Sequence, residues 1–177
     1  MKLKSILSAI AASAVAIGSI ATFSQSSFAQ RGKTVYFCGK SSTGIPTTYA
    51  RTASGKRIPI ISWQKPWSNE FTPEKRCQIV SQKFQKAEEE GVLNYLTSAV
   101  ASNSNVICGT RRYGGPCNIV LFTLRDEDQP NEVLGALFGT GFKASGPLIQ
   151  SEDGSPRDYY DVAFMLTQKS KLTTKSR

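Results

Sequence analysis

The side chains best suited to chemistry in this sequence are four cysteines: Cys38, Cys77, Cys108 and Cys117. Such a set can close two disulfides or hold a zinc ion. The intervals of 39, 31 and 9 residues between them lack the short paired spacing that four-cysteine zinc sites usually show. We therefore expect disulfides with structural roles and no metal site.

Four cysteines allow three connectivities, and spacing alone does not select one. Residues 109–116 lie between two predicted strands and include Gly114-Gly115-Pro116, so a bridge that closes this loop is geometrically easy. We expect Cys108 to pair with Cys117 and, by elimination, Cys38 with Cys77. On the loop-entropy model, a closure of about 40 residues stabilises the fold by roughly 4 kcal/mol and one of about 10 residues by roughly 2.7 kcal/mol.

The chain contains no histidine. This excludes Ser-His-Asp and Cys-His catalysis, and histidine-ligated zinc or haem. Carboxylates cluster at residues 126–128, at 152–153, and at Asp158 and Asp161, without the interleaved ligands of a calcium loop. A carboxylate pair could hydrolyse a glycan if the two groups lay about 5 to 10 Å apart, but solvated loop charge is the interpretation we favour. We expect no catalytic residue and no cofactor.

Trp63, Trp67 and Phe71 crowd one segment beside Lys65. Aromatic side chains there could stack on a sugar ring or enter a membrane interface. The alternative, which we favour, is packing over the helix that follows, with Phe71 as a staple before the helix cap. Trp63 and Trp67 are candidate interaction residues.

Residues 1–29 have the pattern of a secretory signal peptide. Two lysines precede a mostly apolar run over residues 6–21, and Ser27-Phe28-Ala29 offers a cleavage site. A membrane anchor is the alternative, but the apolar run is short for a span. We expect a mature chain that begins at Gln30 and is exported to the periplasm, the thylakoid lumen or the extracellular space, where disulfides persist.

The basic excess of the chain is concentrated at its C-terminus. Lysine and arginine outnumber aspartate and glutamate by 9, and four of the basic residues are Lys169, Lys171, Lys175 and Arg177. We expect residues 169–177 to form a solvated, disordered tail. The alternative is contact with an anionic membrane surface or an acidic protein, where each basic side chain adds on the order of 1 kcal/mol. Nucleic acid is not an expected partner of an exported chain.

Helix signals are clearest between residues 72 and 91. Thr72 is a suitable N-cap, Pro73 suits the first helical position, and Gly91 suits the end. Apolar side chains recur at steps of three and four residues and should share one buried face: Cys77, Val80, Phe84 and Ala87. A shorter helix is expected over residues 130–138.

Strand signals dominate the rest of the chain. Strands are expected over residues 33–38, 46–51, 56–63, 92–101, 105–108, 118–124 and 159–166. Pro59 places the third of these at a sheet edge or a bulge. Residues 142–149 are expected as loop or irregular strand. The pattern favours a single α+β domain over residues 30–168: an antiparallel sheet with one main helix and one shorter helix packed on it, and two disulfides.

A series of short segments carries a family resemblance, in this order along the chain: Phe37-Cys38, Thr47-Thr48, Ala50-Arg51, Ile60-Ile61-Ser62-Trp63, Thr72-Pro73-Glu74-Lys75-Arg76-Cys77, Val80-Ser81, Phe84, Val106-Ile107-Cys108, Cys117 and Leu121-Phe122-Thr123-Leu124. In order and spacing they resemble the circadian oscillating protein family of cyanobacteria, from residue 37 to about residue 166. The resemblance implies a small exported or peripheral membrane domain without an established activity, and it supplies no catalytic residues.

The expected function is a non-catalytic, disulfide-supported interaction module that acts outside the cytoplasm, peripheral to a membrane or bound to an acidic partner. The leader, the cysteines, the basic C-terminus and the family resemblance motivate this hypothesis. The alternative is a carboxylate-dependent hydrolase that acts on a cell-envelope glycan.

Overall fold

The computed structural model describes residues 33–138 and 157–175. The expected signal peptide with its cleavage site, residues 142–149, the acidic pair at 152–153 and Arg177 lie outside the described residues.

The first sheet has three antiparallel strands in the order β1-β2-β3: β1 is Val35–Lys40, β2 is Pro46–Arg51 and β3 is Arg57–Ser62. The register shifts where Thr48 pairs with Ile61 and Tyr49 pairs with Pro59, so Ile60 is an extra residue in β3. Pro59 therefore lies beside a bulge on an edge strand, as expected for a residue that lacks a backbone N–H.

Helix α1 spans Pro73–Glu89. The Oγ1 of its N-cap, Thr72, accepts a hydrogen bond from the backbone N–H of Lys75 at 3.3 Å. Gly91 has a φ of +65°, the left-handed conformation that commonly follows a helix end. The buried side chains include the predicted four: Cys77, Val80, Phe84 and Ala87. The predicted start, end and buried face of this helix are confirmed.

The second sheet has the strand order β6-β5-β4-β7, and all its pairs are antiparallel: β4 is Tyr95–Ala101, β5 is Ser104–Thr110, β6 is Ile119–Thr123 and β7 is Tyr160–Asp161. Helix α2, Pro130–Phe138, has the predicted bounds and contacts β4 and β5. The α+β class, the antiparallel pairing and the packed helices are confirmed.

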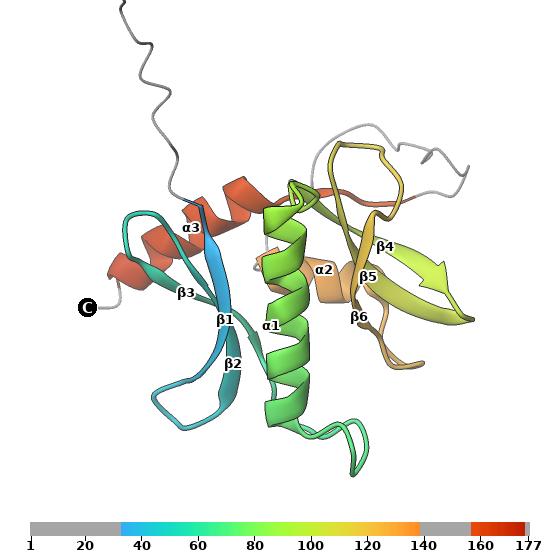
Figure 1. Ribbon diagram of the computed structural model, residues 1–177, viewed down its shortest axis with the longest axis horizontal. Coiled ribbons are helices and arrows are strands. Elements are labelled where there is room, and N and C mark those ends of the chain that lie inside the picture. The colour runs from blue at the N-terminus through green and yellow to red at the C-terminus, as the bar shows by residue number, and fades with distance from the viewer. Residues whose placement is uncertain (1–32, 139–156, 176–177) are drawn as a thin grey trace, which may run out of the picture. The chain divides into compact units, whose positions relative to one another are not determined.

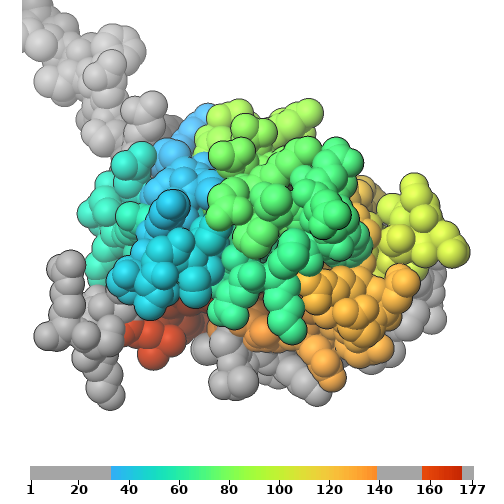
Figure 2. All heavy atoms as spheres, turned by 90° about the horizontal axis from the view of Figure 1, so that it is seen from below, coloured from blue at the N-terminus to red at the C-terminus, as the bar shows by residue number. Residues whose placement is uncertain are grey.

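The strands form two sheets, where the sequence favoured one. Helix α1 follows β3 and precedes β4, and it contacts β1 and β2 of the first sheet as well as β6 of the second. Figure 1 shows α1 between the two sheets, and Figure 2 shows its outer side between the blue first sheet and the orange segment. Hairpin signals specify neighbouring strands but not whether successive hairpins join one sheet, which is decided by packing on the helix.

The predicted strand over residues 159–166 is wrong beyond its start. Only Tyr160–Asp161 is a strand, and helix α3 spans Val162–Lys175, including most of the predicted disordered tail. The backbone N–H of Phe164 donates to Asp161 Oδ1 at 2.8 Å, as a helix N-cap requires. Three side chains at helical spacing are buried in the core: Val162, Met165 and Leu166. Burial of this face stabilises a segment whose composition alone does not specify a helix.

A buried polar group ties α1 to the first sheet. Thr48 Oγ1 accepts hydrogen bonds from Trp63 Nε1 at 3.0 Å and from Ser81 Oγ at 3.1 Å, and its side chain is fully buried. Trp63 also meets Phe122 of β6 edge-on, with 6.2 Å between the ring centroids. Through these contacts the end of β3 joins the helix to both sheets.

Both expected disulfides are confirmed. Cys38 of β1 bonds to Cys77 in the second turn of α1, and Cys108 of β5 bonds to Cys117 across the loop at residues 109–116. The first bridge fixes the helix to the edge of the first sheet. The second closes a loop at the end of β5.

Replacement of Cys38 and Cys77 by alanine should lower the free energy of unfolding by about 4 kcal/mol, and replacement of Cys108 and Cys117 by about 2.7 kcal/mol, because the first bridge closes the longer loop. Urea denaturation of both double variants under the same conditions measures the difference. A larger loss from the Cys108 and Cys117 pair would contradict the loop-length explanation.

Gly91→Ala should destabilise the protein by about 1 kcal/mol, because alanine is strained in the left-handed conformation. Gly135→Ala is the matched control: this glycine lies inside α2, where an added Cβ meets no atom within 4 Å. It should raise the free energy of unfolding by up to about 1 kcal/mol through helix propensity. Thermal denaturation distinguishes the two signs, and stabilisation by both substitutions would rule out the left-handed cap.

Candidate functional site

The loop before α1 carries two large aromatic side chains that remain exposed. Trp67 is 42% exposed and Phe71 is 40% exposed. The backbone N–H of Trp67 donates to the Phe71 carbonyl at 3.0 Å, and the Phe71 N–H donates to Ser68 Oγ at 3.2 Å. These bonds close the loop on itself at the N-terminal end of α1 (Figure 1).

Arg76 connects this loop to α1. Its guanidinium carbon lies 4.5 Å from the ring centroid of Trp63 and 5.1 Å from that of Trp67. Its Nη1 also donates to the carbonyl of Lys65 at 3.4 Å. Each cation–π contact contributes about 0.5–1 kcal/mol at a site open to solvent and more where the cation is desolvated. Arg76 therefore positions the ring of Trp67 against the start of the helix.

Burial and neighbouring charges shift the pKa of Arg76 in different directions. Burial is the main cause that lowers the pKa of Arg76, Arg125 lowers it further, and Asp128 raises it. An arginine side chain remains a cation in proteins despite such influences. The stacked group therefore presents a fixed positive charge beside Trp67.

A cavity of about 260 Å³ adjoins the exposed aromatic rings. Val80, Leu121 and Phe122 give it apolar walls, and Lys83 adds a cation. The Nζ of Lys75 lies 5.2 Å from the ring centroid of Phe71. We call this surface the Trp67 face and define it by five side chains: Trp67, Phe71, Lys75, Arg76 and Lys83. It combines exposed aromatic surface with positive charge.

The structure separates the two tryptophans that the sequence paired as interaction residues. Trp63 is only 5% exposed, and its indole N–H is bonded to Thr48. Trp63 therefore packs in the core, as the favoured interpretation of this aromatic segment expects, and its side chain is not accessible for direct contact with a partner. Trp67 keeps the exposure that direct contact requires.

Of the basic residues near the C-terminus, Lys169, Lys171 and Lys175 lie on α3. Helix α3 begins beside the C-terminal end of α1, whereas the Trp67 face lies at the N-terminal end. Burial lowers the pKa of Lys169, while Lys171 is exposed and Lys175 is the last residue of α3. Within the part of the chain that the structure describes, Lys169 and Lys171 therefore do not share a surface with Trp67.

Three of the acidic residues that the sequence singled out have local structural partners: Glu127, Asp128 and Asp161. Asp128 Oδ2 accepts the backbone N–H of Arg125 at 3.1 Å, and Glu127 pairs with the Arg125 guanidinium at 3.8 Å. Asp161 caps α3, as described above. Asp158 acts on Tyr160 through its charge. Burial is the main cause that raises the pKa of Tyr160, and the charge of Asp158 raises it further.

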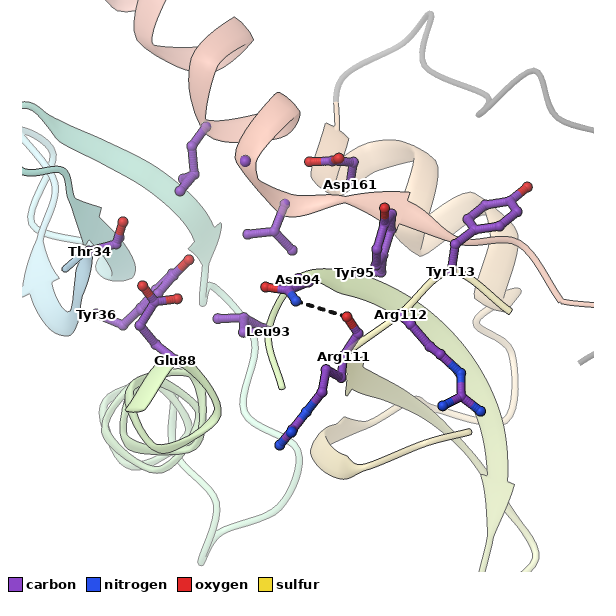
Figure 3. A pocket seen from close by; sticks show the side chains of 13 residues that line it. Thr34, Tyr36, Glu88, Leu93, Asn94, Tyr95, Arg111, Arg112, Tyr113 and Asp161 are labelled. Atoms are coloured by element: carbon purple, nitrogen blue, oxygen red, sulfur yellow. Dashed lines mark hydrogen bonds between the residues drawn. The ribbon is translucent and has the colours of Figure 1, made fainter. Parts of the chain in front are cut away.

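A second cavity, of about 490 Å³, lies at the C-terminal end of α1. Its lining comes from β1, from α1, from the start of β4, from the loop closed by Cys108 and Cys117, and from the junction of β7 and α3. Figure 3 shows Tyr36 and Glu88 on one side, Tyr113 on the other, and Asn94 and Tyr95 between them. We call it the Glu88 cavity.

Two buried or half-buried polar groups face this cavity. Tyr36 is 4% exposed, and its hydroxyl has no hydrogen-bond partner within the part of the chain that the structure describes. Burial, and then the charge of Glu88, raise the pKa of Tyr36. Burial is also the main cause that raises the pKa of Glu88, while the backbone N–H of Thr34 and the charge of Lys33 lower it.

Neither Tyr36 nor Glu88 was predicted from the sequence as a site residue. One signal could have found Tyr36: if Cys38 faces α1 to form its disulfide, the two-residue period of a strand turns Tyr36 toward the same side. Glu88 gave no signal, because it is one of three consecutive glutamates at a helix end. Its setting depends on segments far away in the sequence.

Residues 33–138 and 157–175 contain no group of three or more cysteine and acidic side chains that could hold a metal ion. Over the same residues, the helices are too short or too polar to cross a membrane.

A family model described as "Circadian oscillating protein COP23" matches residues 35–168, from the start of β1 into α3. The chain belongs to this family. The COP23 match contains all four cysteines, the Trp67 face and nearly the whole lining of the Glu88 cavity. Neither the curated proteins nor the solved structures provided a match.

The raised pKa of Glu88 predicts a pH dependence of stability. The folded state holds this proton more tightly than the unfolded chain, so the contribution of Glu88 is fully present below its ordinary pKa of 4.5 and is lost as pH rises through the raised value. Glu88→Gln should remove this loss, so the stability of the variant relative to the wild type should increase from acidic to neutral pH.

Urea denaturation at several pH values measures this difference, and Glu89→Gln is the matched control on the exposed side of the same turn. A relative stability of Glu88→Gln that decreases toward neutral pH would contradict the assigned direction.

Proposed function

We propose that this COP23-family chain is an exported, non-catalytic binding module that associates peripherally with an anionic membrane surface through the Trp67 face. The observation that carries the proposal is the exposure of Trp67 and Phe71, at 42% and 40%, beside three cationic side chains.

The composition of the Trp67 face suits a membrane interface. Tryptophan rings favour the headgroup region of a bilayer, where one part of the ring is apolar and another is polar. Each nearby lysine or arginine adds about 1 kcal/mol of attraction to anionic lipids. Stable peripheral binding usually takes two signals, and this surface offers aromatic rings and positive charge together.

An acidic protein is the other partner that positive charge would fit. The membrane is favoured because the cations adjoin exposed aromatic rings and a cavity with apolar walls, which acyl chains can contact. Lys171 and Lys175 on α3 contribute more weakly, through long-range electrostatic attraction to the same negative surface. Of these three lysines, Lys169 is least suited to attract an anionic membrane, because burial disfavours its charged form.

Two disulfides support the export part of the proposal. Disulfides persist in the periplasm, in comparable lumenal compartments and outside cells, and are rare in the reducing cytosol. The leader pattern of residues 1–29 points in the same direction.

A carboxylate-dependent hydrolase of a cell-envelope glycan is the second candidate function. The observation that favours it is that Glu88 and Asp161 line the same cavity. A non-catalytic module is preferred because each carboxylate accepts a backbone hydrogen bond, from Thr34 and from Phe164, that gives it a structural role. Release of reducing ends from peptidoglycan or envelope polysaccharide, abolished by Glu88→Gln, would support the hydrolase instead.

Vesicle flotation tests the membrane proposal directly. The purified protein should float with vesicles that contain phosphatidylglycerol and much less with pure phosphatidylcholine, and added salt should weaken binding. Combined Lys75→Gln and Lys83→Gln should reduce the partition coefficient roughly tenfold or more, since two cations contribute about 2 kcal/mol. Trp67→Ala with Phe71→Ala should also reduce it.

Val100→Ala is the control, because Val100 is 73% exposed on β4, outside the Trp67 face. Lys171→Gln tests the α3 contribution separately and should have a smaller effect than the two lysines of the Trp67 face. Flotation that is unchanged in both Trp67-face variants, or absent with anionic vesicles, would overturn the proposal.

A further inference from the structure

We infer that the Glu88 cavity is a binding site for a neutral saccharide of one or two rings. This goes beyond the proposed membrane association, because the Glu88 cavity and the Trp67 face lie at opposite ends of α1. Its volume of about 490 Å³ is within the usual range for small-molecule sites.

The charges around the cavity favour a neutral ligand. Glu88 and Asp161 contribute carboxylates to its lining, while Arg111 and Arg112 contribute guanidiniums and Lys33 lies close enough to affect Glu88. An anion would be repelled by the two carboxylates, and a cation by Arg111 and Lys33. A ligand without net charge meets neither penalty.

The hydrogen-bonding groups favour a ligand rich in hydroxyls. The carboxylates and the side-chain oxygen of Asn94 are acceptors, whereas the guanidinium of Arg111 is a donor. The phenol of Tyr95 can do either. Sugar hydroxyls both donate and accept, so they can pair with every group in such a mixed set.

Tyr36 adds a buried group that lacks a partner. Its hydroxyl is directed into the space between β1 and α3, next to Glu88 (Figure 3), and no described residue bonds to it. A buried hydroxyl is unfavourable when it remains unpaired. A ligand hydroxyl that enters this end of the cavity would supply the missing partner.

Aromatic rings form the opposite wall. Tyr113 is 38% exposed and lies between Tyr95 and Tyr159, with centroid distances of 5.9 and 5.4 Å. The apolar face of a sugar ring can pack on such a partly exposed aromatic ring while its hydroxyls reach polar neighbours. The tyrosine wall and the acceptors across from it therefore match the two sides of a saccharide.

The wall that carries Arg111 and Tyr113 is held rigidly. The Cys108–Cys117 disulfide closes the loop, and Tyr159 donates from its hydroxyl to the Gly115 carbonyl at 2.9 Å. Asn94 Nδ2 donates to the Arg111 carbonyl at 2.8 Å, and Arg111 Nη2 donates to the Glu90 carbonyl at 3.2 Å. Groups that are already fixed lose little conformational freedom when a ligand binds.

The test is a titration of ¹⁵N-labelled protein, followed by ¹H–¹⁵N correlation spectra, with cellobiose, lactose, maltose and N,N′-diacetylchitobiose up to 50 mM. At least one saccharide should produce saturable shifts of the amides of Asn94, Tyr95 and residues 111–113. Butylamine and sodium phosphate are the charged comparison probes. Absence of saturable shifts with all four saccharides, shifts confined to other surfaces, or cavity binding by a charged probe alone would overturn the inference.

Tyr113→Ala should weaken saccharide binding about 3- to 10-fold through loss of the ring, and Tyr113→Phe, which keeps the ring, should bind like the wild type. The spectra of each variant report directly whether it is folded. If Tyr113→Ala fails to fold, Glu88→Gln replaces it and should change the affinity while Glu89→Gln does not. Equal affinities in the wild type and in every folded Tyr113 or Glu88 variant would overturn the inference.

Trp67→Ala with Phe71→Ala should leave the saccharide-induced shifts unchanged. The saccharide proposal and the membrane proposal can therefore be tested independently of each other.

Discussion

Burial of one helix against two separate sheets is the constraint on which the rest of this structure depends. The inner face of α1 fills the space beside β1 and β2 and also contacts β6, so neither sheet has a complete core without it. Phe84 is fully buried in this core, and the Cys38–Cys77 disulfide fixes the helix to β1. Thr48 completes the attachment because one hydroxyl accepts bonds from Trp63 and Ser81. At the C-terminal end of α1, Arg111 donates to the Glu90 carbonyl, so the surfaces at both ends of the helix are fixed in position.

These two ends differ in chemistry for reasons that follow from their surroundings. At the N-terminal end, Arg76 stacks between two tryptophan rings and leaves Trp67 exposed beside cationic side chains. At the C-terminal end, α1 meets the disulfide loop of the second sheet and the start of α3, which enclose polar groups of both charges. The first arrangement suits an extended interface, whereas the second suits a compact ligand. One domain can thus present two independent binding surfaces.

Features specified by nearby residues could be predicted from the sequence. The cap at Thr72, the end at Gly91 and the three- and four-residue spacing of the buried face were sufficient for α1, and the short loop between Cys108 and Cys117 identified its disulfide. The division into two sheets was not predictable in this way, because it depends on where α1 packs. Helix α3 was mistaken for a strand because Tyr159 to Leu166 is rich in aromatic and apolar residues, while its helical state depends on burial against distant segments. Burial likewise distinguishes Trp63 from Trp67, and the lining of the Glu88 cavity comes from segments more than 100 residues apart.

The Cys38–Cys77 disulfide also determines what a protease can do to this domain. Exposed loop tips are preferred sites of cleavage, and the loop that carries Trp67 and Phe71 is such a site by exposure. Residues 39–76, which include this loop, lie inside the covalent ring that the disulfide closes. A single cut there would leave the two fragments joined through sulfur and held by the common core. A protease could therefore nick the loop that carries Trp67 and Phe71 without separating the first sheet from the helix.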